Sequence, residues 1–319
     1  MNKGIEVLRP GLLTTVQDLG RYGYQQYGMV VAGAMDAFSL AVGNLLVGNP
    51  RNAAGLEITL IGPELQFHQE SVIAITGADL KATLDNHPLP RWKSIYVEPG
   101  QILRFHRPQQ GIRAYLCIAG GIDVKPIMKS RSTFLKGKMG GYQGRALQSG
   151  DILPVGSTHL PFSQITGRFL SPREQPVYDK KVTLRVIMGP QADAFTEEGV
   201  HTFLTSSYKV TPQSDRMGTR LEGPPIQHKE GADIISDGIA PGSIQVPAGG
   251  QPIILLADRN TTGGYTKIAT VISVDLPLIA QSAPGHTLSF RAVEIEEAQK
   301  LAIAQEKLLR QLEIIGRKG

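Results

Sequence analysis

Short apolar runs separated by glycine and proline are the feature that most limits what this chain can fold into. Such runs occupy residues 56–60, 72–76, 94–97, 102–105 and 115–119. Turn-forming residues stand between them, among them Pro63, Gly77, the pair Pro99-Gly100 and the pair Gly120-Gly121. Short strands repeating about every 8–12 residues with turn signals between them are typical of a β-sandwich or β-barrel. The sequence therefore predicts a mainly β fold.

Composition agrees with many tight turns and excludes several classes of protein. Glycine and proline, at 36 and 21 of 319 residues, are frequent but below the level of low-complexity disorder. The single cysteine, Cys117, excludes an intrachain disulfide framework. A net charge of +5 without any long basic run gives nucleic-acid binding no support.

Hydropathy predicts a protein that does not enter a membrane. The longest apolar run, residues 114–119, is far shorter than the roughly 20 residues that a spanning helix needs. The first six residues contain no apolar signal core, so export is not expected. With the lone thiol, this predicts a cytoplasmic protein.

Three segments have helical spacing of apolar residues. Asp36 is placed to cap a helix over residues 37–46, which Gly48 and Pro50 would end. A second helix is expected over 192–202 and a third over 293–315. Residues 14–33 are expected to form a loop.

The two halves of the chain resemble each other. A turn-then-strand phrase occurs three times, around Gly100, Gly150 and Gly285, and each half has a helix near its start. This pattern predicts two related, barrel-like β domains. We expect an N-terminal domain over 1–160, a linker over 161–180 that is rich in proline, and a C-terminal domain over 181–319 that includes the terminal helix.

Most familiar catalytic motifs are missing from the sequence. No Gly-x-x-x-x-Gly-Lys-Ser/Thr phosphate loop and no Gly-x-Ser-x-Gly serine elbow occurs. The seven histidines lack metal-ligand spacing, so no metal site is expected. Cys117 stands inside an apolar run, which favours a buried thiol over a nucleophile.

Three polar clusters remain as candidate sites. The first covers 14–21 and 33–36, the second 214–218, and the third 236–247 with 257–265. In the third, an apolar strand over 253–256 leads directly into Asp258 and Arg259 and then into Gly263 and Gly264. Polar side chains at a strand end point rigidly into a pocket, while glycines let a ligand approach the backbone. With Gln245 as donor and acceptor, this set suits a small amide or carboxylate.

The same clusters carry a resemblance to a known family. The chain resembles the allophanate hydrolase subunit 2 family, also called the biotin-dependent carboxyltransferase or KipA-type family, which includes the C subunit of bacterial 5-oxoprolinase. The matching strings lie at residues 11–21, 33–36, 75–79, 119–122, 130–133, 214–218 and 256–265. The family pattern usually has glutamine where this chain has Asn260, which weakens any role for that position.

This resemblance implies a fold, partners and cofactors. The fold would be two tandem cyclophilin-like β-barrel domains with a few peripheral helices. The partners would be the A and B subunits of 5-oxoprolinase, of which B is of the allophanate hydrolase subunit 1 and kinase-inhibitor type. ATP would act through that complex, which would convert 5-oxo-L-proline to L-glutamate, and the chain would be inactive alone.

The resemblance and the residue types together suggest roles for ten residues. Each activity of the family must bind a planar amide and stabilise charge on its oxygen. The expected catalytic residues are Arg216, Asp258 and Arg259. The expected substrate-binding residues are Asp18, Asp36, Gln245, Thr261, Thr262, Gly263 and Gly264.

Two other functions remain open at this point. One is a regulatory protein that binds and antagonises an inhibitor of a sporulation histidine kinase. The other is a biotin-dependent carboxyltransferase that acts on urea or a related amide and uses biotin held elsewhere. The sequence does not separate these from the 5-oxoprolinase subunit.

Overall fold

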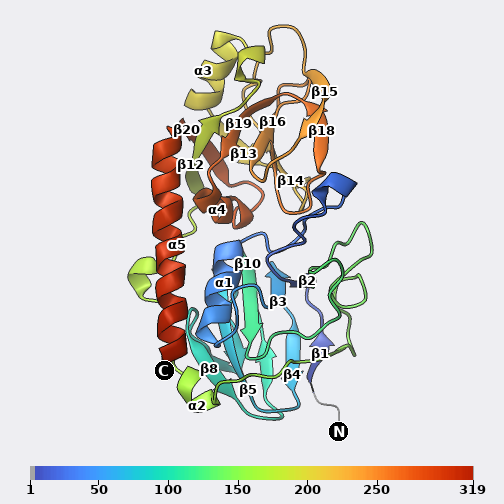
Figure 1. The fold of residues 1–319 in the computed structure, drawn as a ribbon, viewed down its shortest axis with the longest axis vertical. Helices are drawn as coiled ribbons and strands as arrows, with labels where there is room; N and C mark the ends of the chain where they lie inside the picture. The colour runs from blue at the N-terminus through green and yellow to red at the C-terminus, as the bar shows by residue number, and fades with distance from the viewer. Residues whose placement is uncertain (1–3, 319) are drawn as a thin grey trace. The chain divides into compact units, whose positions relative to one another are not determined.

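The computed structural model describes residues 4–318 and is built mainly of strands (Figure 1). It divides into two compact units. Unit 1 comprises Met1–Arg21, Ala32–Tyr178 and Lys307–Gly319, and unit 2 comprises Tyr22–Val31 and Asp179–Glu306. The predicted mainly β fold class is confirmed. The domain boundaries stay a prediction, although Ile165 and Leu170, from the expected linker, are buried in the packing of unit 1.

Unit 1 contains two antiparallel sheets that share one core. The six-stranded sheet has the order β11-β1-β4-β9-β6-β7 and the five-stranded sheet the order β2-β3-β10-β5-β8. The strands of the first are β1 (Ile5–Arg9), β4 (Glu64–Phe67), β6 (Thr83–Leu84), β7 (His87–Pro88), β9 (Ile102–Arg104) and β11 (Ile152–Leu153). The strands of the second are β2 (Leu13–Gln17), β3 (Gly55–Thr59), β5 (Ser71–Asp79), β8 (Ser94–Val97) and β10 (Gln110–Ile118).

The core of unit 1 lies between these sheets. Val7 and Phe67 of one sheet and Ile58, Ile75 and Leu116 of the other belong to one buried cluster. Within the described residues the two sheets are hydrogen-bonded separately and face each other across the core. The edge strands β7 and β11 are two residues long and offer few backbone groups with which to bridge the sheets.

Helix α1 (Ala37–Leu46) covers the other face of the five-stranded sheet. Successive side chains of a strand point to opposite faces, so Leu116 enters the sheet–sheet core while Tyr115 and Cys117 pack under α1. The predicted cap is confirmed: the Asp36 carboxylate accepts a hydrogen bond from the Ser39 backbone N–H at 2.9 Å. Cys117 is fully buried, and burial raises the pKa of its thiol, as expected for a non-nucleophilic cysteine.

Unit 2 is a closed barrel with a separate two-stranded ribbon. The barrel order is β12-β19-β16-β17-β14-β13-β20, and a parallel pairing of β12 with β20 closes it. Its strands are β12 (Lys181–Met188), β13 (Ser207–Val210), β14 (Gly218–Glu222), β16 (Ser243–Gln245), β17 (Ile253–Leu255), β19 (Lys267–Val271) and β20 (Thr287–Ala292). The ribbon pairs β15 (Asp233–Gly238) with β18 (Thr262–Tyr265), and Figure 1 shows it at one side of the barrel.

The remaining helices are mostly short. They are α2 (Phe162–Ile165), α3 (Glu197–Thr205), α4 (Leu276–Ala280) and α5 (Ile295–Lys318), with 3₁₀ turns η1 (Gln25–Tyr27), η2 (Pro172–Glu174), η3 (Ala192–Ala194) and η4 (Ser273–Asp275). Leu308 and Leu312 of α5 pack against the core beneath α1. None of the helices between residues 4 and 318 is long and apolar enough to cross a bilayer.

The repeated turn phrase has the same structure in both units. Its glycine takes a left-handed conformation each time, with φ of 91°, 87° and 87° at Gly100, Gly150 and Gly285. Each glycine N–H donates to the carbonyl of a residue in a neighbouring strand, namely Phe67, Val7 and Val210. The repeated sequence phrase therefore corresponds to a repeated turn, in which a left-handed glycine is hydrogen-bonded to a neighbouring strand.

Two expectations about local structure are wrong. Residues 14–17, expected in a loop, belong to β2, because Thr14, Thr15 and Val16 are buried and pair with β3. The helix expected over 192–202 is interrupted. Its first residues form η3, and Thr196 then caps α3 by accepting from the Gly199 N–H at 2.9 Å.

Candidate functional site

Arg216 and Asp258 form a buried ion pair at one end of the unit 2 barrel. Arg216 precedes β14 and Asp258 follows β17, and these strands are antiparallel neighbours. The guanidinium donates from Nε and Nη2 to the two carboxylate oxygens at 3.1 and 3.0 Å. The two side chains are only 7% and 6% exposed. This bidentate geometry joins two turns that lie far apart in sequence.

The backbone adds to this connection. The Asp258 N–H donates to the Arg216 carbonyl and the Leu256 N–H to the Met217 carbonyl, both at 2.9 Å. The ion pair and these two bonds hold the following residue, Arg259, in a fixed place. Asp258 therefore pairs with Arg216 and not with its sequence neighbour.

Arg259 is a buried cation that no carboxylate in residues 4–318 neutralises. Its side chain donates from Nε to the Ile239 carbonyl at 3.0 Å and from Nη1 to the Leu256 carbonyl at 3.2 Å. The residue is 8% exposed, and burial lowers the pKa of its guanidinium. Nη2 has no hydrogen-bond partner among the described residues. A buried charge without a counter-charge is costly, and it favours an anion that approaches the remaining donors.

Ile239 links this cation to Gly263, and Gly263 in turn lies against Gln245. Gln245 ends β16, is 6% exposed and donates to the Tyr265 carbonyl at 3.4 Å. A Cβ on Gly263 would lie 2.8 Å from the Gln245 amide nitrogen and 2.7 Å from Ile239 Cδ1. A larger residue at this position would push the ends of the Gln245 and Ile239 side chains away.

The other predicted residues of the third cluster, residues 261–264, come shortly after β17 in the chain. The Thr261 carbonyl accepts from the Ile239 N–H at 3.0 Å, while Thr262 and Gly264 belong to β18. Thr262 is exposed and Gly264 is partly exposed. The structure therefore gathers Arg216, Asp258, Arg259, Gln245 and the 261–264 segment into one connected region of unit 2.

Sequence reasoning missed one buried charge in this region. Lys267, the first residue of β19, is the register partner of Gln245, and its side chain is 4% exposed. Its ammonium donates to the Asp237 carboxylate on β15 at 3.0 Å. A lysine that directly follows Tyr265-Thr266 and opens the apolar run 268–269 was the available signal, because lysine is seldom buried unless it is paired.

Asp18 lies in unit 1 and is engaged by the chain itself. Its carboxylate accepts from the Ser130 and Ser132 hydroxyls and from the backbone N–H groups of Gly20 and Arg131. These bonds tie the 130–133 string to the loop after β2. They give Asp18 a structural role, and its predicted contact with substrate stays a prediction.

Asp36 also lies in unit 1, fully buried at the start of α1. Besides the cap, its carboxylate accepts from the Ser39 hydroxyl at 2.6 Å and from the Tyr178 hydroxyl at 3.2 Å. Its N–H donates to the hydroxyl of Tyr115, whose pKa burial raises well above the usual range. Its predicted role in substrate binding stays a prediction as well.

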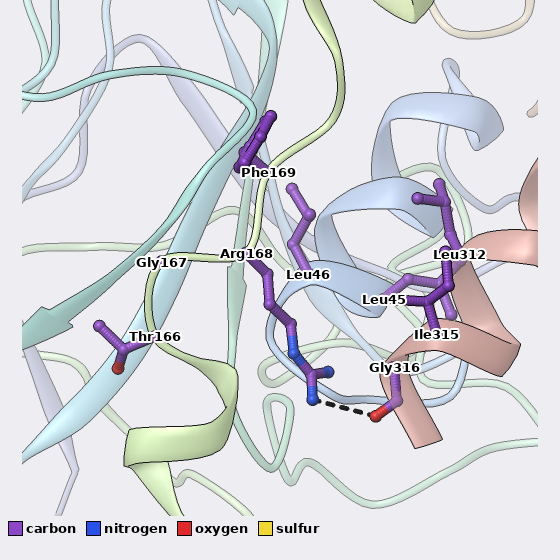
Figure 2. A pocket seen from close by; sticks show the side chains of 9 residues that line it. All are labelled: Leu45, Leu46, Thr166, Gly167, Arg168, Phe169, Leu312, Ile315 and Gly316. Carbon is purple, nitrogen blue, oxygen red and sulfur yellow. Dashed lines mark hydrogen bonds between the residues drawn. The ribbon is translucent and has the colours of Figure 1, made fainter. Parts of the chain in front are cut away.

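A cavity of about 400 Å³ lies elsewhere in unit 1 (Figure 2). Leu45 and Leu46 of α1, residues 166–169, and Leu312 and Ile315 of α5 line it. Figure 2 shows Arg168 reaching the last turn of α5, where its guanidinium donates to the Gly316 carbonyl at 3.0 Å. None of the predicted site residues lines this cavity.

Comparison of the sequence with known proteins identifies the family of this chain. Residues 27–292 match the carboxyltransferase domain family, subdomain A and B. The chain belongs to this carboxyltransferase domain family.

Two bacterial members of the family are similar over almost their whole length. The C subunit of 5-oxoprolinase from Escherichia coli strain K12 is 39% identical, and the protein of the same name from Haemophilus influenzae is 38% identical. Each comparison covers 97% of both chains.

A solved structure shows the same fold inside a larger protein. The K. lactis urea amidolyase structure matches 97% of this chain with a TM-score of 0.90 and 35% identity. This chain spans only 20% of that protein. The family predicted from the seven sequence strings is confirmed.

Proposed function

We propose that this chain is the C subunit of an ATP-dependent 5-oxoprolinase and acts with the A and B subunits to convert 5-oxo-L-proline to L-glutamate. The observation that carries the proposal is the buried Arg259 guanidinium, which no carboxylate in residues 4–318 neutralises. Similarity to the C subunits of two bacterial 5-oxoprolinases, over 97% of their length, supports the choice of reaction.

The site residues have separate tasks in this proposal. Opening of the lactam places negative charge on the amide oxygen, and preorganised donors in a water-poor site stabilise that charge most effectively. Arg259 donates to this oxygen from Nη2. Gln245 contacts the amide edge of the ring, and Gly263 and Gly264 let the ring approach the backbone.

The Arg216–Asp258 pair positions Arg259 by joining the turns after β17 and before β14. Thr261 and Thr262 offer hydroxyl groups at the edge of the same region. A shift of about 1 Å in such a site is enough to reduce rate substantially.

ATP does not fit the described site by itself. The region holds two guanidinium groups, the Lys267 ammonium, an amide and two carboxylates. Among the described residues these carboxylates pair with Arg216 and Lys267, which leaves one cation, Arg259, for a ligand, and the sequence has no phosphate-binding loop. We therefore assign ATP to the complex, derive no step through it in this chain, and expect the chain to be inactive alone. We also propose that the chain binds a small amide, assembles with the A and B subunits, and acts in the cytoplasm.

The similarity to urea amidolyase favours one second candidate, a biotin-dependent carboxyltransferase that acts on urea or a related amide. The same amide-binding groups would serve it, since urea is also a planar amide. It requires a biotin carboxylase and a biotin carrier in trans. Carboxylation of urea on addition of those two components, without glutamate formation from 5-oxoproline, would favour this candidate.

Omission of one component tests the main proposal. The purified A and B subunits are mixed with this chain, 5-oxoproline and ATP, and glutamate is measured. Glutamate should form only when all three proteins are present. Unchanged glutamate formation without this chain would defeat the proposal.

A further inference from the structure

Lys267 has a buried ammonium group, and the carboxylate that pairs with it, that of Asp237, is half-exposed. Its side chain is 4% exposed, whereas that of Asp237 is 55% exposed. Asp237 Oδ2, at 3.0 Å from Nζ, is the one hydrogen-bond partner of the Lys267 ammonium among the described residues, while the Lys267 backbone N–H donates to Gln191 Oε1. An ammonium has three donors, so this pairing leaves capacity for another acceptor.

Asp237 belongs to a ribbon that is attached to the barrel by the chain that continues from β18 into β19 and by single hydrogen bonds. β15 and β18 pair with each other and form no ladder with the barrel strands. Ile235, on the same strand, is 95% exposed, and a Cβ added to Gly231 or Gly238 would meet nothing within 4 Å. β15 has a ladder with β18 alone, and that ladder is irregular between Asp233 and Asp237, so local opening at β15 is favoured over opening of the barrel strands.

The ribbon lies against the residues that we assign to amide binding. Asp237 is the register partner of Gly263, and Gly263 approaches the Gln245 amide. Lys267 is in turn the register partner of Gln245. Asp237, Gly263, Gln245 and Lys267 therefore form one cluster. The hydrogen bond from Lys267 lowers the pKa of Asp237, so this carboxylate is ionised at neutral pH.

We propose that Lys267 binds the carboxylate of the substrate and that Asp237 occupies this position in the free protein. The ribbon then acts as a gate. An anionic lactam displaces Asp237 and takes its place on the ammonium, whereas a neutral amide gains nothing from doing so. Lys267 is thus a specificity-determining residue. This inference rests on the proposed function, because the carboxylate in question is that of 5-oxoproline.

The test compares two ligands in the reconstituted complex of the three proteins. 5-Oxoproline is the substrate, and 2-pyrrolidinone, the same lactam without the carboxylate, is added as the competing ligand whose Ki is measured. Lys267→Met should raise the KM for 5-oxoproline about tenfold or more and change kcat much less, since a charge-assisted bond is lost. The Ki of 2-pyrrolidinone should stay within about twofold. Lys209→Met, at an exposed lysine of β13, is the matched control and should change neither constant.

A second variant keeps the inference testable if Lys267→Met does not fold. Asp237→Asn removes the competing charge and should lower the KM for 5-oxoproline several-fold without changing the Ki of 2-pyrrolidinone. It should also speed amide hydrogen exchange over residues 233–238. Asp233→Asn, at an exposed carboxylate of the same strand, should do neither.

Failure of the inference and failure of the proposed function are distinguishable. A wild-type complex that forms no glutamate overturns the proposed function and the substrate named with it. An active complex in which Lys267→Met leaves KM unchanged, or shifts KM and Ki together, overturns the inference alone. If Asp237→Asn changes neither the amide hydrogen exchange of residues 233–238 nor the KM for 5-oxoproline, the claim that the ribbon acts as a gate is overturned.

Discussion

Replacement of Asp258 by asparagine tests whether the Arg216 pair is as buried as the structure shows. Asparagine keeps the shape of the side chain but removes its charge. Arg216 then stays in a site where it was 7% exposed and loses both charge-assisted bonds, now at 3.0 and 3.1 Å. Loss of one partner of a buried pair costs about 3–5 kcal/mol, whereas an exposed pair costs about 1 kcal/mol or less. We therefore expect Asp258→Asn to lower the free energy of unfolding by about 3 kcal/mol.

A double variant separates the pair from simple loss of packing. Arg216→Met with Asp258→Leu replaces both charges by apolar groups, so no buried charge remains unpaired. Such replacements are often close to neutral, and we expect the double variant to lie within about 1 kcal/mol of the wild type.

Urea unfolding followed by far-ultraviolet circular dichroism measures both effects. Fluorescence of Trp92, the single tryptophan, which is buried in unit 1, reports separately on that unit. A loss below about 1 kcal/mol in Asp258→Asn would show that solvent reaches the pair. A double variant as unstable as the single one would refute the charge argument.

Two further predictions concern unit 1. Gly43→Ala should destabilise the protein by about 1–3 kcal/mol although alanine favours helices, because its Cβ would lie 2.7 Å from Cys117 Sγ. The Trp92 fluorescence transition measures this loss. Adding Cys117→Ala should recover most of it. The hydrogen bond with Arg145 lowers the pKa of Asp151, so its stabilisation is present above the unfolded carboxyl pKa of about 3.9 and is lost as pH falls through the folded value. The stability difference between wild type and Asp151→Asn should therefore shrink from pH 7 to pH 2 in urea titrations, and a difference independent of pH would contradict this assignment.

Much of the fold could be predicted from local patterns in the sequence. The left-handed glycines at 100, 150 and 285 and the Asp36 cap depend on few neighbouring residues, so the sequence indicates them directly. Residues 14–17 form a strand because of pairing with β3, which lies about 40 residues further along the chain. Such long-range pairing leaves little local signal.

The candidate site shows the same limit. Asp258 and Arg259 stand out as a polar turn after an apolar strand, but this local pattern does not identify the partner of either charge. The barrel instead brings Arg216 to Asp258 from 42 residues away and leaves Arg259 without a carboxylate in the described part of the chain. Lys267 and Asp237 are 30 residues apart and became a pair only through the ribbon.

The most direct test of the account is glutamate formation by the reconstituted complex of the three proteins carrying Arg259→Ala in this chain. The account predicts that glutamate formation from 5-oxoproline and ATP is abolished while the variant still folds and joins the complex. Arg220→Ala, at an exposed arginine of β14, should retain wild-type activity as the matched control. Wild-type rates in a folded, assembled Arg259→Ala complex would contradict the claim that this buried guanidinium stabilises the reacting amide.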